Sequence, residues 1–224
     1  MIAIAGNPAI DAMSARAKSP APRRGRAEGA SEDPDPPERQ RAVETEIRAA
    51  GIDRPLTLGV AIAIPEPHAS ALTGWRRRIG DPQADLIWPH VTLLPPTPVE
   101  PIRIGVIEDH LAAAAASRPP FVMHLSGTGT FRPVSPVVFI QVARGLSDCE
   151  MLEKVIRRGP LQRHLDFPYH PHVTVAQDVS DDALDLVYDG LSGFLARFAV
   201  ERFTLFERHP DGKWLPRSEF ALGA

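Results

Sequence analysis

Two histidines of this sequence stand in the same short context, each followed two residues later by a threonine. The tetrapeptide Pro-His-Val-Thr occurs at residues 89–92 and again at residues 171–174, so His90 and His172 are 82 residues apart. Alternate side chains of an extended strand project from the same face. Each copy therefore places an imidazole and a hydroxyl side by side on one strand face.

These side chains suit proton transfer at an anionic group. The unperturbed pKa of histidine is about 6.5, so His90 and His172 can act as one neutral base and one protonated acid near neutrality. The hydroxyls of Thr92 and Thr174 can donate hydrogen bonds to an oxyanion. One His-x-Thr alone is more often a structural histidine at a sheet margin, but two copies in matching contexts indicate an internal duplication.

Helical and extended patterns alternate around both motifs, as expected if each copy is carried by its own lobe. Strands are expected at residues 56–65, around His90, and at 121–131, 137–143 and 172–177, with a hairpin over 198–222 that turns at 210–213. Helices are expected at residues 67–80, 101–117, 145–159 and 180–198, the last capped by Ser180. Interleaved helices and dense hairpins predict an α+β fold with largely antiparallel sheets.

The N-terminal part differs in composition from the rest. Residues 1–37 are rich in Pro, Ala, Arg and acidic residues, so they cannot bury enough apolar surface to offset their ordering entropy, and we expect a disordered tail. Residues 38–50 suit a short helix or linker, with Pro37 at its start and Gly51 as its stop. The globular domain is expected to cover residues 51–224.

Composition limits the class of protein. Of the 224 residues, 43% are hydrophobic and 24% are charged, and the net charge of −3 argues against a generally basic nucleic-acid-coating surface. The one cysteine, Cys149, excludes an intrachain disulfide framework and a cysteine-rich zinc site. This cysteine usage suits the reducing cytoplasm. With no apolar run of about twenty residues and no positively charged start before an apolar segment, we expect no membrane partner and no secretory signal. We also expect a monomer.

Taken with their apolar strands and spacing, the paired His-x-Thr motifs resemble those of the two-histidine (2H) phosphoesterase superfamily. Within it, the bacterial 2′-5′ RNA ligase-like proteins and the cyclic nucleotide phosphodiesterases are the most similar, and the resemblance covers residues 55–222. It implies two pseudo-symmetric lobes, each a small, mostly antiparallel sheet with helices outside, that form a central cleft. It assigns catalysis to His90 and His172, and phosphate binding to Thr92 and Thr174.

The resemblance implies metal-independent hydrolysis of a 2′,3′-cyclic phosphate or a related small cyclic nucleotide, without a cofactor. RNA 2′-5′ ligation at an RNA end is the alternative activity, and a non-catalytic nucleotide- or RNA-binding module is the alternative from another class. Ligase-like members often have an aromatic residue after the first motif and an arginine after the second. Here Leu93-Leu94-Pro95-Pro96 and Gln177 stand there, which favours the phosphodiesterase.

Two further residues are possible substrate contacts. Arg132 could bind a phosphate, or it could be an exposed arginine of a hairpin turn. Tyr169, like Phe167, could stack on a base, or it could pack the loop before the second motif.

Other polar residues have simpler interpretations. We expect Arg76, Arg77 and Arg78 to form a solvated helix face, and His164 and His209 to lie on the surface. His170 and His172 are two potential metal ligands, but two ligands without a nearby Cys or Glu are weak evidence for a site, and we predict no metal. Residues 127–130, Gly-Thr-Gly-Thr, suggest a strand bulge rather than a phosphate-binding loop, since the lysine and the helix start are missing.

Overall fold

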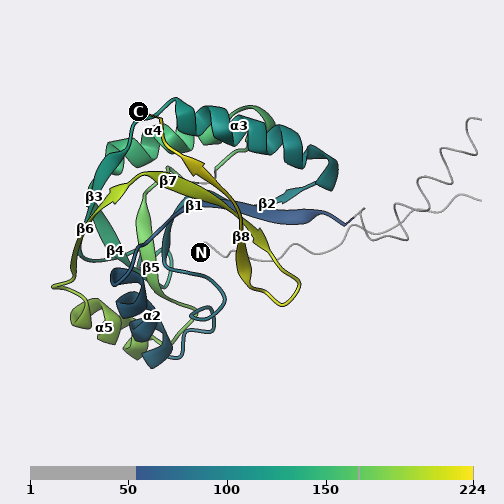
Figure 1. The fold of residues 1–224 in the computed structure, drawn as a ribbon. Coiled ribbons are helices and arrows are strands. Elements are labelled where there is room, and N and C mark those ends of the chain that lie inside the picture. Colours follow the sequence, from purple (N-terminus) through teal and green to yellow (C-terminus); the bar gives the residue numbers. More distant parts are fainter. Residues whose placement is uncertain (1–53, 166, 224) are drawn as a thin grey trace, which may run out of the picture. The chain divides into compact units, whose positions relative to one another are not determined.

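Antiparallel strands form two four-stranded sheets in the computed structural model, which describes residues 54–165 and 167–223 (Figure 1). The first sheet has the order β2 (His90–Val99), β1 (Leu56–Ala63), β7 (Arg202–Arg208) and β8 (Trp214–Ala221). The second has the order β5 (His172–Gln177), β4 (Val137–Arg144), β3 (Phe121–Thr130) and β6 (Leu195–Val200). The α+β class and the two-lobed architecture predicted from the sequence are confirmed.

Two of the four helices in the described residues pack against the sheet whose strands they do not connect. The four helices are α2 (His68–Arg78), α3 (Ile104–Ala116), α4 (Leu146–Ile156) and α5 (Asp181–Gly190), with the single turns η1 (Pro101–Arg103) and η2 (Gly159–Leu161). Helix α2 connects two strands of the first sheet but packs against β5 of the second, whereas α4 connects two strands of the second sheet and packs against β2. Helix α3 contacts β8 and α4, and α5 contacts β3, β4 and β5. Each motif strand is thus supported by the helix that precedes the other motif.

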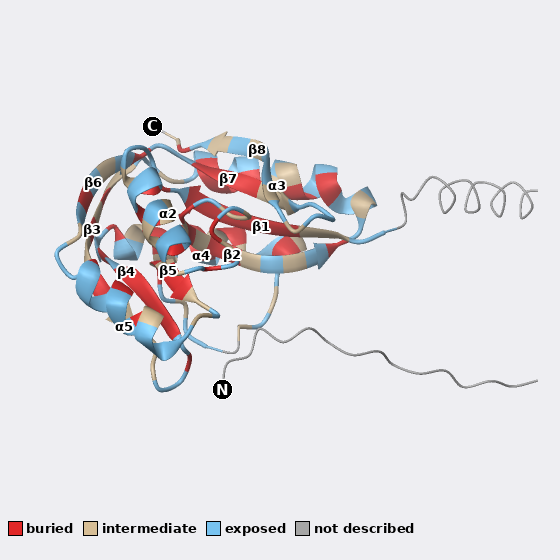
Figure 2. Ribbon diagram, turned by 90° about the horizontal axis from the view of Figure 1, so that it is seen from below, coloured by how far each residue is buried: buried red, intermediate tan, exposed pale blue. Residues whose placement is uncertain are grey.

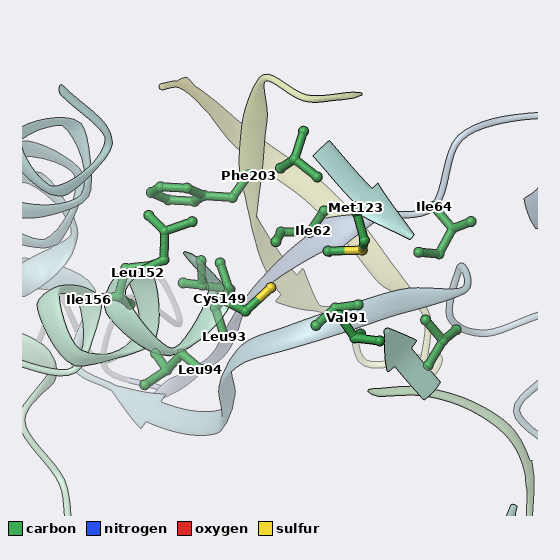
Figure 3. Packing of buried hydrophobic residues seen from close by; sticks show 14 of the residues in the cluster. Ile62, Ile64, Val91, Leu93, Leu94, Met123, Cys149, Leu152, Ile156 and Phe203 are labelled. Atoms are coloured by element: carbon green, nitrogen blue, oxygen red, sulfur yellow. The ribbon is translucent and has the colours of Figure 1, made fainter. Parts of the chain in front are cut away.

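Both sheets bury one face in a common hydrophobic core. On β1 the alternate residues Leu58, Val60 and Ile62 are at most 2% exposed, as the two-residue period of a strand requires. Figure 2 shows the buried positions along the strands, and Figure 3 shows Phe203 beside Leu152 of α4. The opposite strand faces are left to carry polar side chains, among them the two motifs.

The expected helix at 180–198 is wrong in its second half. Helix α5 ends at Gly190, and residues 195–200 form β6, which pairs with β3. Its start is correct, since the Ala183 N–H donates to the Ser180 Oγ at 3.3 Å. The apolar residues after Gly193 fit the residue spacing of a helix as well as that of a strand. Pairing with β3 selects the strand, because it places Ala196 and Val200 in the core.

Other local expectations are confirmed. Strands β7 and β8 form the predicted C-terminal hairpin. The β3–β4 pairing shifts register between Leu125 and Thr128, and Gly127 has a φ of +65°, so the glycine-rich stretch is a bulge. The predictions for the tail at 1–37 and the helix at 38–50 lie outside the described residues. Within the part of the chain that the structure describes, no helix is long and apolar enough to cross a membrane.

Candidate active site

The two Pro-His-Val-Thr motifs lie on edge strands that meet. Strand β2 is at the edge of the first sheet and β5 at the edge of the second, and the two strands contact each other. The burial pattern is the same in both motifs: proline and valine are buried, while histidine and threonine are half-buried. The valines anchor each strand in the core. In each strand the histidine and the threonine share the other face, as predicted.

Each imidazole is oriented by the same backbone hydrogen bond. His90 Nδ1 lies 2.7 Å from the carbonyl oxygen of Trp88, and His172 Nδ1 lies 2.7 Å from the carbonyl oxygen of His170. A carbonyl oxygen can only accept, so Nδ1 carries the hydrogen, and Nε2 of the neutral ring keeps its lone pair. Both rings therefore present Nε2 as the atom that can take up or release a proton.

Three hydrogen bonds hold the loop before His90. The buried Arg76 donates to the carbonyl of Ile87 at 2.8 Å, and the Trp88 indole N–H donates to the carbonyl of Ile64 at 2.8 Å. The Ile64 N–H in turn donates to the carbonyl of Pro89 at 2.9 Å. These bonds fix the Trp88 carbonyl that orients His90.

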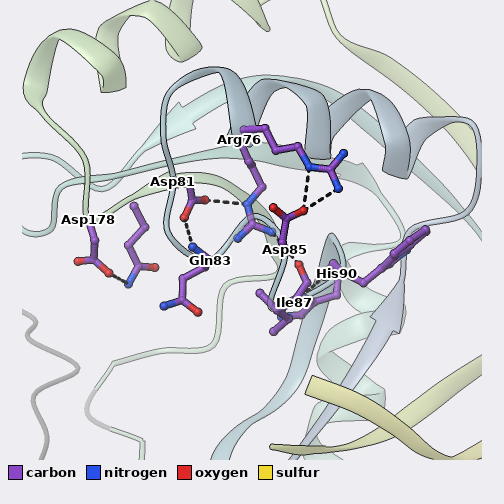
Figure 4. A network of polar contacts seen from close by, with 10 residues as sticks. Arg76, Asp81, Gln83, Asp85, Ile87, His90 and Asp178 are labelled. Atoms are coloured by element: carbon purple, nitrogen blue, oxygen red, sulfur yellow. Dashed lines mark hydrogen bonds and ion pairs between the residues drawn. The ribbon is translucent and has the colours of Figure 1, made fainter. Parts of the chain in front are cut away.

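Arg76 was expected on a solvated helix face, and this expectation is wrong. Its side chain is 5% exposed, and its Nε lies 2.7 Å from an oxygen of Asp81, whose side chain is 1% exposed (Figure 4). Arg76 follows the buried Leu72 by one helical turn, so it points inward, and Asp81 from the following turn neutralises it. Arg77 and Arg78 are exposed, as predicted.

The loop before His172 is tied to the other motif. The Tyr169 hydroxyl donates to the carbonyl of Thr92 at 2.9 Å, and the ring packs against the hydrophobic core. Burial raises the pKa of this phenol well above its usual range, so it remains a donor. This contact favours the packing alternative for Tyr169 over base stacking, and it gives Tyr169 a role that the sequence did not indicate.

Two phenylalanines surround His172. The ring centroids of Phe131 and Phe139 lie 5.0 Å and 5.1 Å from that of the imidazole. Phe139 is the ladder partner of Thr174 on β4, so it shares the motif's face. Its ring lies over Gly129 of β3, where a Cβ atom would be 2.6 Å from two ring carbons, so only glycine leaves the space.

This apolar surrounding alters proton binding at both histidines. Burial lowers the pKa of His172 to about 4, opposed by the bond to the His170 carbonyl and assisted by the charges of His170 and His90. Burial also lowers the pKa of His90, opposed by the Trp88 carbonyl and assisted by the positive charge of Arg76. The two imidazoles are thus close enough for the charge of one to oppose protonation of the other, and both are neutral near pH 7.

The remaining candidates lie apart from this pair. Arg132 forms a 2.6 Å ion pair with Asp185 of α5, so its guanidinium is already paired with a carboxylate. Phe167 is 51% exposed, and His164 and His209 are exposed, as predicted for the two histidines. Within residues 54–165 and 167–223, no three His, Cys, Asp or Glu side chains are grouped so that they could hold a metal ion.

Sequence reasoning missed the residues that support the histidines. For Arg76 the available signal was Asp81 five residues later, which offers a partner for one arginine of the three. For Phe131 and Phe139 there was no local signal, because their contact with His172 depends on the pairing of β4 with β5.

Comparison with known proteins agrees with the geometry. The family model of the 2′-5′ RNA ligase superfamily matches residues 64–212, which contain both motifs. A protein of Bacillus mycoides (strain KBAB4) described as "Putative phosphoesterase" is 27% identical over 172 residues, covering 75% of this chain and 98% of the relative.

Solved structures of E. coli LigT share the fold. The complex of LigT with NADP+ matches with a TM-score of 0.60 at 23% identity, and the complex with 3′-AMP with 0.56 at 22%. Each of the two matches covers 76% of this chain and 99% of LigT. The family match spans well over half of the sequence, and the chain belongs to the 2′-5′ RNA ligase superfamily, whose members are the LigT-like two-histidine phosphoesterases.

Proposed function

We propose that the chain is a metal-independent phosphodiesterase that hydrolyses a 2′,3′-cyclic phosphate or a related small cyclic nucleotide. His90 and His172 act as its acid–base pair. The observation that carries the proposal is the matched orientation of the imidazoles, each held by a 2.7 Å bond from Nδ1 to a backbone carbonyl on strands that contact each other. An acid–base pair needs two such fixed Nε2 atoms facing one reacting group.

The reaction requires one proton to be taken up and one to be released. The neutral imidazole removes a proton from water through Nε2, and the resulting oxygen nucleophile forms a bond to phosphorus. The bond from phosphorus to one ribose oxygen breaks, and the protonated imidazole donates its proton to that oxygen. The product is a phosphomonoester beside a free ribose hydroxyl, and the two histidines have exchanged protonation states.

Thr92 and Thr174 stabilise the charge on phosphorus. Each lies two residues after its histidine on the same strand face, so its hydroxyl can donate to a non-bridging phosphate oxygen. Such donors contribute most when they are fixed before the reaction. Acid, base and phosphate donors are all provided by the two motifs, so the mechanism needs no metal.

The comparisons support a nucleotide as substrate. LigT, which has this fold, is solved with 3′-AMP and with NADP+. A further LigT structure, 26% identical to this chain with a TM-score of 0.52, contains ATP. Gln177 stands where ligase-like members often have arginine, which favours hydrolysis of a small nucleotide over ligation of RNA ends.

The test is turnover of nucleoside 2′,3′-cyclic phosphates by folded variants. His90→Ala and His172→Ala should each lose on the order of a hundredfold or more in kcat, because each removes one proton transfer. The double variant should lose much less than the product of the two single losses, since the pair acts as a unit. Thr92→Val and Thr174→Val should show smaller losses, and the exposed His209→Ala is the matched control, with wild-type turnover expected.

Near wild-type turnover from either motif-histidine variant would refute the two-histidine mechanism. Nucleotide binding without turnover in the wild-type chain would instead favour the binding module. Joining of RNA ends without hydrolysis of cyclic mononucleotides would favour the ligase.

A further inference from the structure

The two motifs have different neighbours on their own sheets. Ladder partners on antiparallel strands share a face, so Ala61 and Ala63 of β1 stand beside Thr92 and His90. On the second sheet the equivalent positions of β4 are Phe139 and Gln141, beside Thr174 and His172. The space next to His172 is therefore filled by an aromatic ring, whereas the space next to His90 is bounded by methyl groups only.

A cavity of about 510 Å³ lies over this small-residue floor. Ala63 of β1 and Thr204 of β7 are part of its lining, and its aromatic lining comes from Trp88, Phe206 and Trp214. The ladder pairs Ala61–Thr204 and Gly59–Phe206 place the floor on the face that carries His90 and Thr92. The volume lies in the range of small-molecule sites.

The aromatic walls are fixed in place. The Trp214 ring lies against β1 at Gly59, where a Cβ atom would be 3.1 Å from a ring carbon, so the absent side chain makes room for the indole. The Trp214 backbone N–H donates to the carbonyl of Leu86 at 2.8 Å, which joins the start of β8 to the loop before His90. Trp88, from that loop, is held by its bond to the Ile64 carbonyl.

The cavity begins at the direct neighbours of His90. Ala63, which lines it, is the ladder partner of His90, and Trp88 both lines it and accepts the hydrogen bond from His90 Nδ1. If the phosphate of a substrate is bound at the His90 imidazole, the group attached to that phosphate is therefore adjacent to this cavity. At its rim, Lys213 and the exposed ion pair of Arg77 with Asp85 offer hydrogen-bonding groups.

We propose that this cavity binds the nucleobase of the substrate, with Trp88 and Trp214 as its stacking surfaces. The inference rests on the proposed function, because it takes the phosphate to lie between the two histidines. Indole rings offer broad faces on which any base can stack, and the rim groups can bond to the polar edge of the base. The stacking residue that is missing after the first motif in the sequence is thus replaced by one residue before it and one on β8.

The kinetic test compares two substrates that differ only in the base. They are adenosine 2′,3′-cyclic phosphate and the 2′,3′-cyclic phosphate of 1-O-methylribose. The base should raise kcat/KM by about tenfold to a hundredfold. Trp214→Ala should remove most of this advantage while leaving kcat/KM for the base-free substrate unchanged, and Trp214→Phe should keep most of it. Trp88 is 46% exposed, so Trp88→Ala is expected to fold even if Trp214→Ala does not. Because this variant also loses the indole bond that holds the loop before His90, its readout is the ratio of the two kcat/KM values, which should fall toward one.

A binding test separates this inference from the proposed hydrolysis. The chain has three tryptophans, of which Trp88 and Trp214 line the cavity, so intrinsic fluorescence reports on it. Titration with 3′-AMP should quench this fluorescence, ribose 3-phosphate should not, and Trp214→Phe should weaken the response. Trp75→Phe, which removes the indole outside the cavity, should leave the 3′-AMP affinity unchanged.

The outcomes distinguish the two claims. If neither cyclic phosphate is hydrolysed but 3′-AMP quenches the cavity tryptophans, the hydrolytic function fails and the base site stands. Equal kcat/KM for both substrates, or equal binding of 3′-AMP and ribose 3-phosphate, would overturn the base site whether or not the chain hydrolyses them.

Discussion

The environment of His172 determines how the proposed acid–base pair should respond to pH. The ring lies between Phe131 and Phe139, and burial lowers its pKa to about 4, while the pKa of His90 is lowered as well. The reaction needs one protonated and one neutral imidazole, and protonation becomes rarer as the pH rises above these lowered pKa values. We therefore expect kcat/KM to be bell-shaped with its maximum below about pH 6.5, the unperturbed histidine pKa.

The measurement is kcat/KM for a cyclic mononucleotide between pH 4 and 9, because this ratio reports on the free enzyme. Phe131→Ala should admit water to His172, raise its pKa and move the maximum to higher pH. A wild-type maximum at pH 7 or above, or a profile that Phe131→Ala leaves in place, would contradict this account of the low pKa.

Tyr169 positions the two motifs relative to each other. Its hydroxyl bonds to the Thr92 carbonyl at 2.9 Å, and the next residue, His170, supplies the carbonyl that orients His172. Tyr169→Phe removes one buried bond and should cost about 1 kcal/mol of unfolding free energy. Because geometry is lost as well, we expect kcat to fall by about tenfold, with KM little changed.

Urea unfolding and steady-state kinetics of the Tyr169→Phe variant check these two effects separately. A loss of stability with unchanged kcat would make Tyr169 a packing residue only.

Removal of divalent metal ions with EDTA tests whether His170 and His172 bind a metal that the activity requires. In the proposed mechanism the two motifs provide acid, base and phosphate donors, so turnover should be the same after dialysis against EDTA as before it. Activity that disappears with EDTA and returns with one divalent ion would support metal binding by these two histidines instead.

At the scale of elements, the buried Arg76–Asp81 ion pair joins α2 to the loop before His90. Arg76→Met would leave the Asp81 carboxylate, whose side chain is 1% exposed, without its partner. Such a loss typically costs about 3–5 kcal/mol, whereas replacing both partners by apolar residues is often nearly neutral. We expect Arg76→Met to be strongly destabilised in urea unfolding, and Arg76→Met/Asp81→Leu to recover most of the loss.

The exposed neighbour gives the matched control. Arg77 pairs with Asp85 at the surface, with side chains 62% and 68% exposed, and Arg77→Met should change the unfolding free energy by less than about 1 kcal/mol. Equal effects of the two arginine variants would show that burial does not set the strength of the Arg76 contribution.

At the scale of the whole molecule, we expect the globular domain, residues 51–224, to be sufficient for the activity. Residues 1–37 have the composition of a tail that cannot bury a core, and the family match begins only at residue 64. A chain that starts at Gly51 should keep the full-length kcat and urea midpoint. If the shortened chain is folded but inactive, the N-terminal residues belong to the site.

Much of this protein could be predicted from the sequence. The duplicated Pro-His-Val-Thr, with alternating apolar residues, predicted two strands with His and Thr on one face, because the period of a strand is local. Most helices and strands followed in the same way from local periodicity and turn residues. Strand β6 did not, because only pairing with β3 decides its conformation.

The tertiary structure decided how the motifs are supported and what lies beside them. The bond from Tyr169 to Thr92 and the exchange of α2 and α4 between the sheets join residues far apart in the chain. The burial of Arg76 beside Asp81, only five residues away, was not evident from the sequence either. The same holds for the contrast between Ala63 beside His90 and the phenylalanine rings around His172. No local period encodes such contacts, because they arise only when strands pair within each sheet and the two sheets come together. The sequence alone thus determined which groups could move the protons, and packing determined their pKa values and the open space beside them.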